Sequence, residues 1–161
     1  MIYFKDVRTL EELKSEYHRL CMAHHPDRGG STEAMQIVNA EYAELFQMVK
    51  DKHANKDGKT YTRSTEEAPE AFQNLIEALL RLNGIKISII GSFVWVEGNT
   101  KLHKDVLKGL GFRWHSKKQC WFLSPVGYQR RGRQEYSMEE IRRMYGVRYS
   151  EDVNLKELTS A

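Results

Sequence analysis

Apolar and polar positions alternate with helical spacing in the first third of the chain. The apolar side chains recur every three or four residues, as on one face of an α-helix: Leu10, Leu13, Tyr17 and Leu20. Thr9 and Glu12 fit a capping box at the start of this helix. Pro26 disfavours a helical conformation at the residue before it, so the helix is predicted to end near His24.

A second apolar stripe follows after a short loop. Its members are Met35, Val38, Tyr42, Leu45 and Val49. Ser31 is a good N-cap, and Glu33 in the first turn suits the positive end of the helix dipole. Two amphipathic helices joined by a short loop pack antiparallel and bury their stripes on each other. The sequence therefore predicts a helical hairpin over residues 1–53, with His25-Pro26-Asp27 exposed at its turn.

The middle of the chain is predicted to connect the helical hairpin to the C-terminal part. Residues 54–68 are mostly polar and lack periodicity, which predicts a linker. Residues 69–84 form a predicted connecting helix, with Pro69 in its first turn and Asn83-Gly84 as its stop; a start at Ser64 is the alternative. One face of this helix is apolar: Phe72, Leu75, Ile76, Leu79 and Leu80.

The period then changes from helical to strand-like. Alternating isoleucines at 85–89, the run at 93–96, and the segments 112–114 and 120–123 read as strands around a short helix near 102–110. We therefore predict an α+β protein with the helical hairpin, the connecting helix and a small β-β-α-β-β module at 85–149. One further short helix is predicted at 137–145, before a tail at 150–161.

Composition and charge narrow the class. The chain has 161 residues, of which 40% are hydrophobic and 29% charged, as in folded globular proteins. No apolar run reaches the roughly 18 residues of a membrane span, and no secretory signal is evident, so we expect a cytoplasmic protein without a membrane partner. Cys21 and Cys120 are expected to be buried free thiols. The net charge of +3 hides an asymmetry: residues 1–53 carry seven Lys/Arg against nine Asp/Glu, and residues 85–149 carry thirteen against five.

The hairpin carries the most specific motif. Tyr17-His18-Arg19-Leu20, His25-Pro26-Asp27, Arg28-Gly29-Gly30 and the Asn39, Tyr42, Leu45 spacing resemble the J-domain (DnaJ-like) family. The Gly-Gly after the tripeptide is most similar to the J domains of viral T antigens. The usual first helix of the family is shortened here to Ile2-Tyr3-Phe4, and neither its Gly/Phe-rich linker nor its cysteine-rich zinc domain is present. The chain therefore resembles the J-domain-only class.

The resemblance implies a co-chaperone that stimulates the ATPase of a DnaK-type chaperone. It assigns the chaperone contact to the tripeptide loop and the basic face of the preceding helix: His25, Pro26, Asp27, Lys14, His18, Arg19 and Arg28. Asp27 offers an acceptor for an arginine of the partner, and His25 can donate or accept. The residues alone leave another interpretation open, in which the tripeptide only joins the two helices.

The composition of the C-terminal module suggests that it binds another molecule. Its candidate nucleic-acid-binding residues are Lys101, Lys104, Lys108, Arg113, Lys117, Lys118, Arg130, Arg131 and Arg133. Cations with tryptophans are the combination that single-strand binding uses. Binding of a protein target is equally open, as is a structural role in which the three tryptophans form the core. The string from Gly111 to Trp121 also resembles a short module of plasmid and phage proteins.

Two function hypotheses follow. The first is a co-chaperone that brings a DnaK-type chaperone to a target, such as a nucleic acid or nucleoprotein, through the basic module. The second is a nucleic-acid-binding accessory protein whose J-like hairpin no longer acts on a chaperone. We expect no enzyme activity, because no nucleophile–base pair, paired carboxylates or phosphate-binding glycine loop is evident, and we expect no cofactor or metal. The oligomeric state is not indicated.

Overall fold

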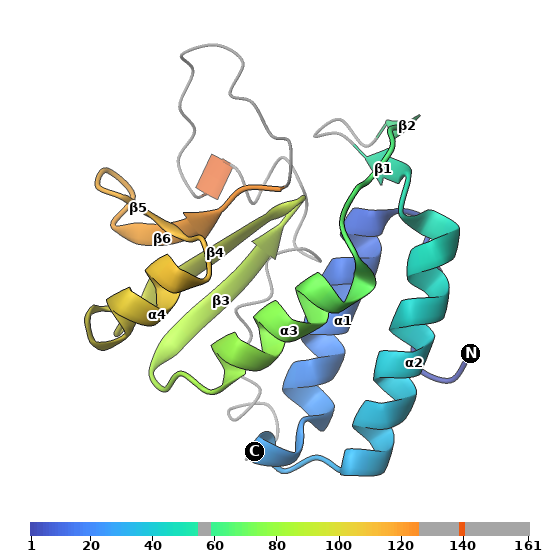
Figure 1. The fold of residues 1–161 in the computed structure, drawn as a ribbon, viewed down its shortest axis with the longest axis horizontal. Coiled ribbons are helices and arrows are strands. Elements are labelled where there is room, and N and C mark those ends of the chain that lie inside the picture. Colours follow the sequence, from blue (N-terminus) through green and yellow to red (C-terminus); the bar gives the residue numbers. More distant parts are fainter. Residues whose placement is uncertain (55–58, 126–138, 141–161) are drawn as a thin grey trace.

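The computed structural model describes residues 1–54, 59–125 and 139–140 (Figure 1). Its helices are α1 (Leu10–His24), α2 (Thr32–Val49), α3 (Pro69–Leu80) and α4 (Lys104–Gly109), with 3₁₀ turns η1 (Pro26–Arg28) and η2 (Lys101–His103). Its strands are β1 (Lys52–Ala54), β2 (Thr60–Thr62), β3 (Ile85–Ile90), β4 (Phe93–Gly98), β5 (Arg113–His115) and β6 (Cys120–Leu123).

The N-terminal hairpin forms as the periodicity predicts. The Thr9 hydroxyl accepts from the Glu12 amide at 3.3 Å at the start of α1, and the Ser31 hydroxyl accepts from the Ala34 amide at 3.1 Å at the start of α2. The two stripes meet in a core whose largest fully buried side chains include Leu13, Tyr42 and Phe46. No helix precedes α1, but Phe4 is buried in the same core.

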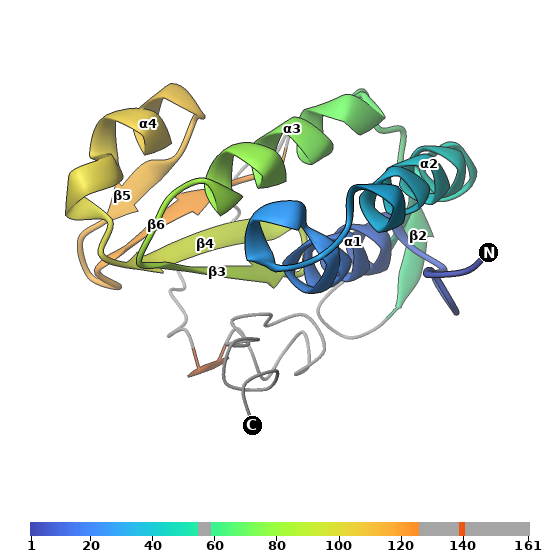
Figure 2. The ribbon, with the colours of Figure 1, turned by 90° about the horizontal axis from the view of Figure 1, so that it is seen from below.

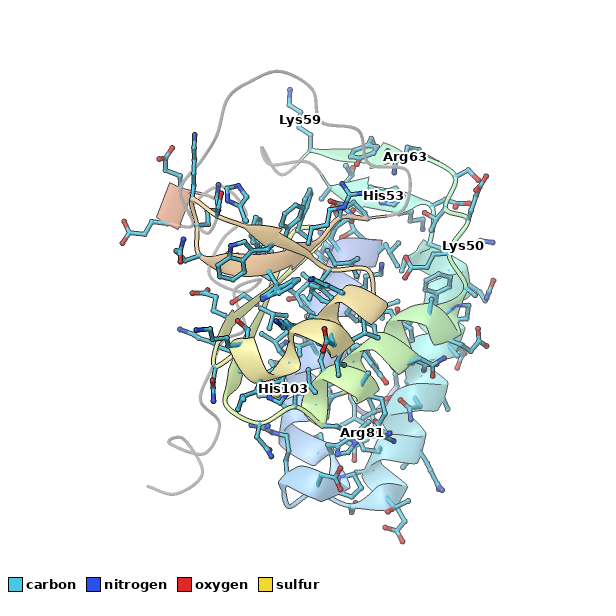
Figure 3. All side chains as sticks on the ribbon, turned by 60° about the vertical axis from the view of Figure 1, so that its left-hand side comes forward. Lys50, His53, Lys59, Arg63, Arg81 and His103 are labelled. Atoms are coloured by element: carbon cyan, nitrogen blue, oxygen red, sulfur yellow. The ribbon has the colours of Figure 1, made fainter. Side chains whose placement is uncertain are left out.

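The predicted linker at 54–68 is wrong in part. Strand β2 lies within it and pairs antiparallel with β1, which places a small hairpin next to α1. Figure 3 shows His53 and Arg63 on this hairpin. His53 is buried, its Nδ1 lies 2.9 Å from the Glu11 carboxylate, and its Nε2 lies 3.1 Å from the Arg63 carbonyl oxygen. Because buried polar contacts hold the strands, no apolar alternation marks them in the sequence.

Helix α3 joins the two halves of the molecule. It begins at Pro69 rather than Ser64, and it ends at Leu80, shortly before the predicted stop. The Phe72 ring lies 5.9 Å from that of Tyr17 and 6.2 Å from that of Tyr42, measured between ring centroids. In Figure 1, α3 crosses the helical hairpin on its way to β3. The connecting helix thus packs as a third helix against the helical hairpin.

The C-terminal module has the predicted β-β-α-β-β order, with η2 preceding α4. Its antiparallel sheet has the strand order β3-β4-β6-β5. Figure 2 shows α3 and α4 on the same face of this sheet. The sheet residues Ile87, Ile89, Val94, Val96 and Trp121 belong to one apolar cluster with Leu107 of α4, Phe112 and the hairpin core. The hairpin and the module therefore share a core.

The other predicted features are placed as follows. Cys21 and Cys120 are buried and neither forms a disulfide, as expected. Trp95 and Trp121 are buried, whereas Trp114 is 45% exposed. Of the predicted helix at 137–145, only residues 139–140 lie within the described part, and they are helical. The tail at 150–161 lies outside it.

The His53–Glu11 contact predicts a stability effect. Replacing His53 by Ala leaves the buried Glu11 carboxylate without this partner, so we expect the free energy of unfolding to fall by about 3 kcal/mol. Urea unfolding followed by circular dichroism measures this. His103→Ala is the matched control, because that ring makes an exposed contact to the Asn83 carbonyl oxygen and its loss should cost less than about 1 kcal/mol. Equal losses in the two variants would contradict the assignment.

Candidate functional site at the turn of the helical hairpin

The backbone of the turn is held by two glycines. Gly29 has a φ of 89°, in the left-handed region that suits glycine. A Cβ atom at Gly30 would lie 1.9 Å from the His24 carbonyl oxygen, so no other residue fits without moving the end of α1. Between α1 and Gly29, the segment Pro26–Arg28 forms a single 3₁₀ turn. The Gly-Gly pair after the tripeptide is therefore a requirement of the turn geometry.

His25 is buried, which corrects the expectation of a fully exposed tripeptide. Its side chain is only 7% exposed, and its Nε2 lies 2.8 and 3.0 Å from the two carboxylate oxygens of Glu77 on α3. Its Nδ1 accepts from the Asp27 amide at 3.1 Å. Since Nδ1 accepts, the ring carries its proton on Nε2 and donates it to Glu77. A residue 52 positions away thus holds the histidine, which no local pattern reveals.

Pro26 and Asp27 stay accessible. The Asp27 side chain is 68% exposed, and its Oδ2 lies 3.8 Å from His25 Nδ1. Its backbone amide donates to His25 inside the turn, whereas its carboxylate is exposed and can accept hydrogen bonds from a partner. Arg28 is half-buried. The turn accordingly offers one carboxylate on a backbone whose conformation is fixed on both sides.

Lys14 lies away from solvent, contrary to the prediction that it forms part of an exposed basic face. Its Nζ lies 2.6 Å from the Glu67 carboxylate, and the two side chains are 11% and 14% exposed. The same ammonium lies 5.1 Å from the centroid of the Phe72 ring. Both contacts are made with the segment that leads into α3 and with α3 itself, so the charge of Lys14 is satisfied within the molecule.

His18 is also buried, again contrary to its predicted place on a docking face. It is 0% exposed, and neither of its ring nitrogens has a hydrogen-bond partner among the described residues. Burial lowers the pKa of His18 from 6.5 to about 4, and the nearby charge of Arg28 acts in the same direction. His18 is therefore a neutral core side chain at neutral pH.

These three side chains share one side of α1. Successive residues turn by about 100° around a helix, so Lys14 and His18 lie about 40° apart around its axis, and His25 follows directly after the last helical residue as the C-cap. Helix α3 and strand β3 both contact α1, and all three side chains are buried. Of the predicted contact residues, Arg19 is exposed and pairs with Glu16 at 2.9 Å. The accessible part of the predicted site is thus Pro26, Asp27 and Arg19.

The basic residues of the C-terminal module are mostly on the surface. Of the predicted nucleic-acid-binding residues in the described part, the exposed ones are Lys101, Lys104, Lys108, Arg113 and Lys117. Lys118 is half-buried, and its amide donates to His115 Nδ1 at 3.2 Å. Trp114 packs edge-on against Trp121, with 5.7 Å between ring centroids. The predicted Arg130, Arg131 and Arg133 lie outside the described residues.

Sequence reasoning missed the two carboxylates that pair with predicted contact residues, one in the first half of α1 and one at the turn. Glu67 and Glu77 pair with Lys14 and His25, respectively. The available signal is weak: Glu77 follows the core residue Ile76, so it lies at the edge of the buried face of its helix. Several other glutamates flank α3, and nothing local distinguishes the two that pair.

Comparison with known proteins found no matching family model, no similar curated protein and no similar solved structure. In the described ranges, no helix is both long and apolar enough to cross a bilayer. The geometry of the turn and the sequence are therefore the basis for any functional proposal.

The environment of His18 predicts a pH dependence of stability. In the unfolded chain His18 takes up a proton near pH 6.5, whereas in the folded protein it does so only near pH 4. Acid therefore favours the unfolded state. The destabilisation caused by His18 is absent above pH 6.5 and grows as the pH falls towards 4. Below pH 4 the loss of stability levels off at about 3 kcal/mol.

Urea unfolding between pH 7.5 and pH 4 measures this loss. The comparison with His18→Leu isolates it from the carboxylates, which titrate in both proteins. We expect the difference in unfolding free energy between the two proteins to shift in favour of His18→Leu as pH falls. A difference that is independent of pH would contradict a buried neutral histidine.

Proposed function

We propose that this chain is a J-domain co-chaperone that stimulates the ATPase of a DnaK-type chaperone. The observation that carries the proposal is the turn itself. Pro26 and Asp27 are exposed on a backbone locked by two glycines between antiparallel helices, and His25 is fixed behind them. A turn that only joined two helices would need neither an outward carboxylate nor a histidine held at both ring nitrogens.

The chemistry of the contact follows from Asp27. An ionised carboxylate accepts two parallel hydrogen bonds from an arginine, and such charge-assisted pairs are stronger than neutral ones. Because the backbone around Asp27 is fixed before binding, little conformational entropy is lost when a partner arrives. Docking then favours the chaperone conformation that hydrolyses ATP, since a partner shifts an equilibrium only by binding one state more tightly.

The proposed contact is smaller than the one that the sequence suggests. Lys14 and His18 are enclosed by the rest of the molecule, which leaves Arg19 as the exposed basic residue of α1 among those predicted. We therefore assign the contact to the end of the hairpin, with Pro26 and Asp27 at its centre. In this proposal the C-terminal module binds the target to which the chaperone is brought.

Single-turnover ATP hydrolysis by DnaK-type chaperones tests the proposal. We expect the wild-type protein to accelerate hydrolysis and Asp27→Asn and His25→Gln each to reduce the acceleration at least about tenfold, because a hydrogen bond to a charged group or its support is lost. Asp105→Asn and His103→Gln make the same chemical changes on the module and should retain full activity. Unchanged stimulation in both tripeptide variants would refute the assignment.

A second candidate function, nucleic-acid binding, is favoured by the surroundings of Trp114. Trp114 is 45% exposed although it stands on a strand of the small sheet, and Lys117 in the turn that follows this strand is exposed as well. Lys101, Lys104 and Lys108 add positive charge on the neighbouring helical segment. An exposed aromatic ring among cations suits a stacked base with its phosphates.

Fluorescence anisotropy with single-stranded oligonucleotides at increasing salt tests this candidate. We expect Trp114→Ala to weaken binding roughly tenfold, because one stacked base is lost. Lys104→Gln should lower the slope of log affinity against log salt by about 0.7, whereas Lys52→Gln on β1 should leave it unchanged. Absence of binding at low salt would rule the candidate out.

A further inference from the structure

We infer that Glu77 is a positioning residue of the proposed chaperone contact: from α3, its carboxylate fixes His25 and through it the conformation of Asp27. The inference rests on the proposed function and adds a residue that lies outside the resemblance to the J-domain family. It makes α3 a working part of the site and not only a connection between the hairpin and the module.

The contacts form a continuous chain. Both carboxylate oxygens of Glu77 lie within 3.0 Å of His25 Nε2, and His25 Nδ1 accepts from the Asp27 amide. A carboxylate is acceptor-only, so it selects the ring tautomer whose proton is on Nε2. That tautomer alone leaves Nδ1 free to accept from Asp27. The carboxylate on α3 and the Asp27 amide thereby select the same tautomer, the one in which a hydrogen bond closes the turn at Asp27.

Removal of the carboxylate has a specific consequence. Without this acceptor, only the Asp27 amide favours the tautomer with the proton on Nε2, so the tautomer with the proton on Nδ1 becomes more populated. In the tautomer with the proton on Nδ1, the Nδ1–H group and the Asp27 N–H group are both donors. The hydrogen bond between the Asp27 amide and Nδ1 is then lost. The backbone hydrogen bonds from Arg28 and Gly30 to the His25 carbonyl oxygen remain, but the Asp27 amide is held less firmly, and part of the entropy of fixing it is lost on binding instead of on folding.

The position of Glu77 suits this role better than a purely structural one. Its side chain is 43% exposed, whereas that of His25 is 7% exposed, so the carboxylate reaches the ring from the surface side of α3. The same carboxylate lies 3.8 Å from the guanidinium of Arg81, which is 70% exposed. Figure 3 labels Arg81 near the end of α3. The exposed Glu77–Arg81 pair contributes little stability by itself.

The test combines a structural and a functional readout on the full chain. Glu77→Ala removes the acceptor, Glu77→Gln keeps a neutral acceptor, and Glu70→Gln makes the conservative change at an exposed position of the same helix. The tautomer of His25 is measured from the ¹⁵N shifts of its ring by NMR at pH 8. Chaperone stimulation is measured by single-turnover hydrolysis as a function of the concentration of this protein.

We expect Glu77→Ala to mix the two tautomers and to raise the concentration for half-maximal stimulation roughly tenfold, as for loss of a hydrogen bond to a charged group. Glu77→Gln should retain the Nε2 tautomer and lie within about threefold of the wild type, since a neutral acceptor gives a weaker bond. Arg81→Gln and Glu70→Gln should leave both readouts unchanged. Rescue by glutamine separates positioning from a general loss of stability.

The outcomes distinguish the inference from the function on which it rests. A wild-type protein that stimulates, together with a Glu77→Ala variant that keeps the Nε2 tautomer or full stimulation, overturns the role of Glu77 and leaves the proposed function standing. A wild-type protein that stimulates no DnaK-type chaperone overturns both. Stimulation by the wild type with coupled loss of tautomer and potency in Glu77→Ala supports both.

Discussion

The packing of α3 and β3 against α1 governs the rest of this structure. It encloses the side of α1 that carries Lys14, His18 and His25, and it merges the core of the helical hairpin with that of the sheet. A hairpin of two helices has little apolar surface to bury, and units of about fifty residues are only marginally stable alone. The added layer gives the hairpin a core, and it decides which polar groups of α1 remain accessible.

Enclosing polar side chains has a free-energy cost, and the molecule meets it in two ways. Lys14 and His25 each receive a carboxylate, from Glu67 and Glu77, so the buried groups keep hydrogen bonds. His18 receives no partner from the described residues and is accommodated in its neutral form. The first solution adds directional contacts between α1 and the α3 region, whereas the second makes the hairpin sensitive to acid. Specific pairing and simple desolvation therefore coexist along one helix face.

Local patterns predicted what is locally determined. The caps at Thr9 and Ser31 and the end of α1 before Pro26 depend on contacts within a few residues, and the structure agrees with them. The β-β-α-β-β order also follows from changes of period. The small hairpin that contains His53 was missed because buried polar contacts to Glu11, 42 residues earlier, hold it. The burial of His25 was missed for the same reason, since its partner is 52 residues away.

The same contrast separates two parts of the candidate site. The motif indicated that Asp27 matters and that two glycines follow, and the backbone geometry explains why glycine is needed at both positions. What the motif lacked is the support behind the tripeptide, because a carboxylate on a later helix is invisible to any pattern read along α1. Because the apolar face of α3 packs into the core that the hairpin and the sheet share, Glu77 stands on an element that belongs to both parts of the molecule. The position of the His25 ring therefore depends on the packing of α3 as well as on α1.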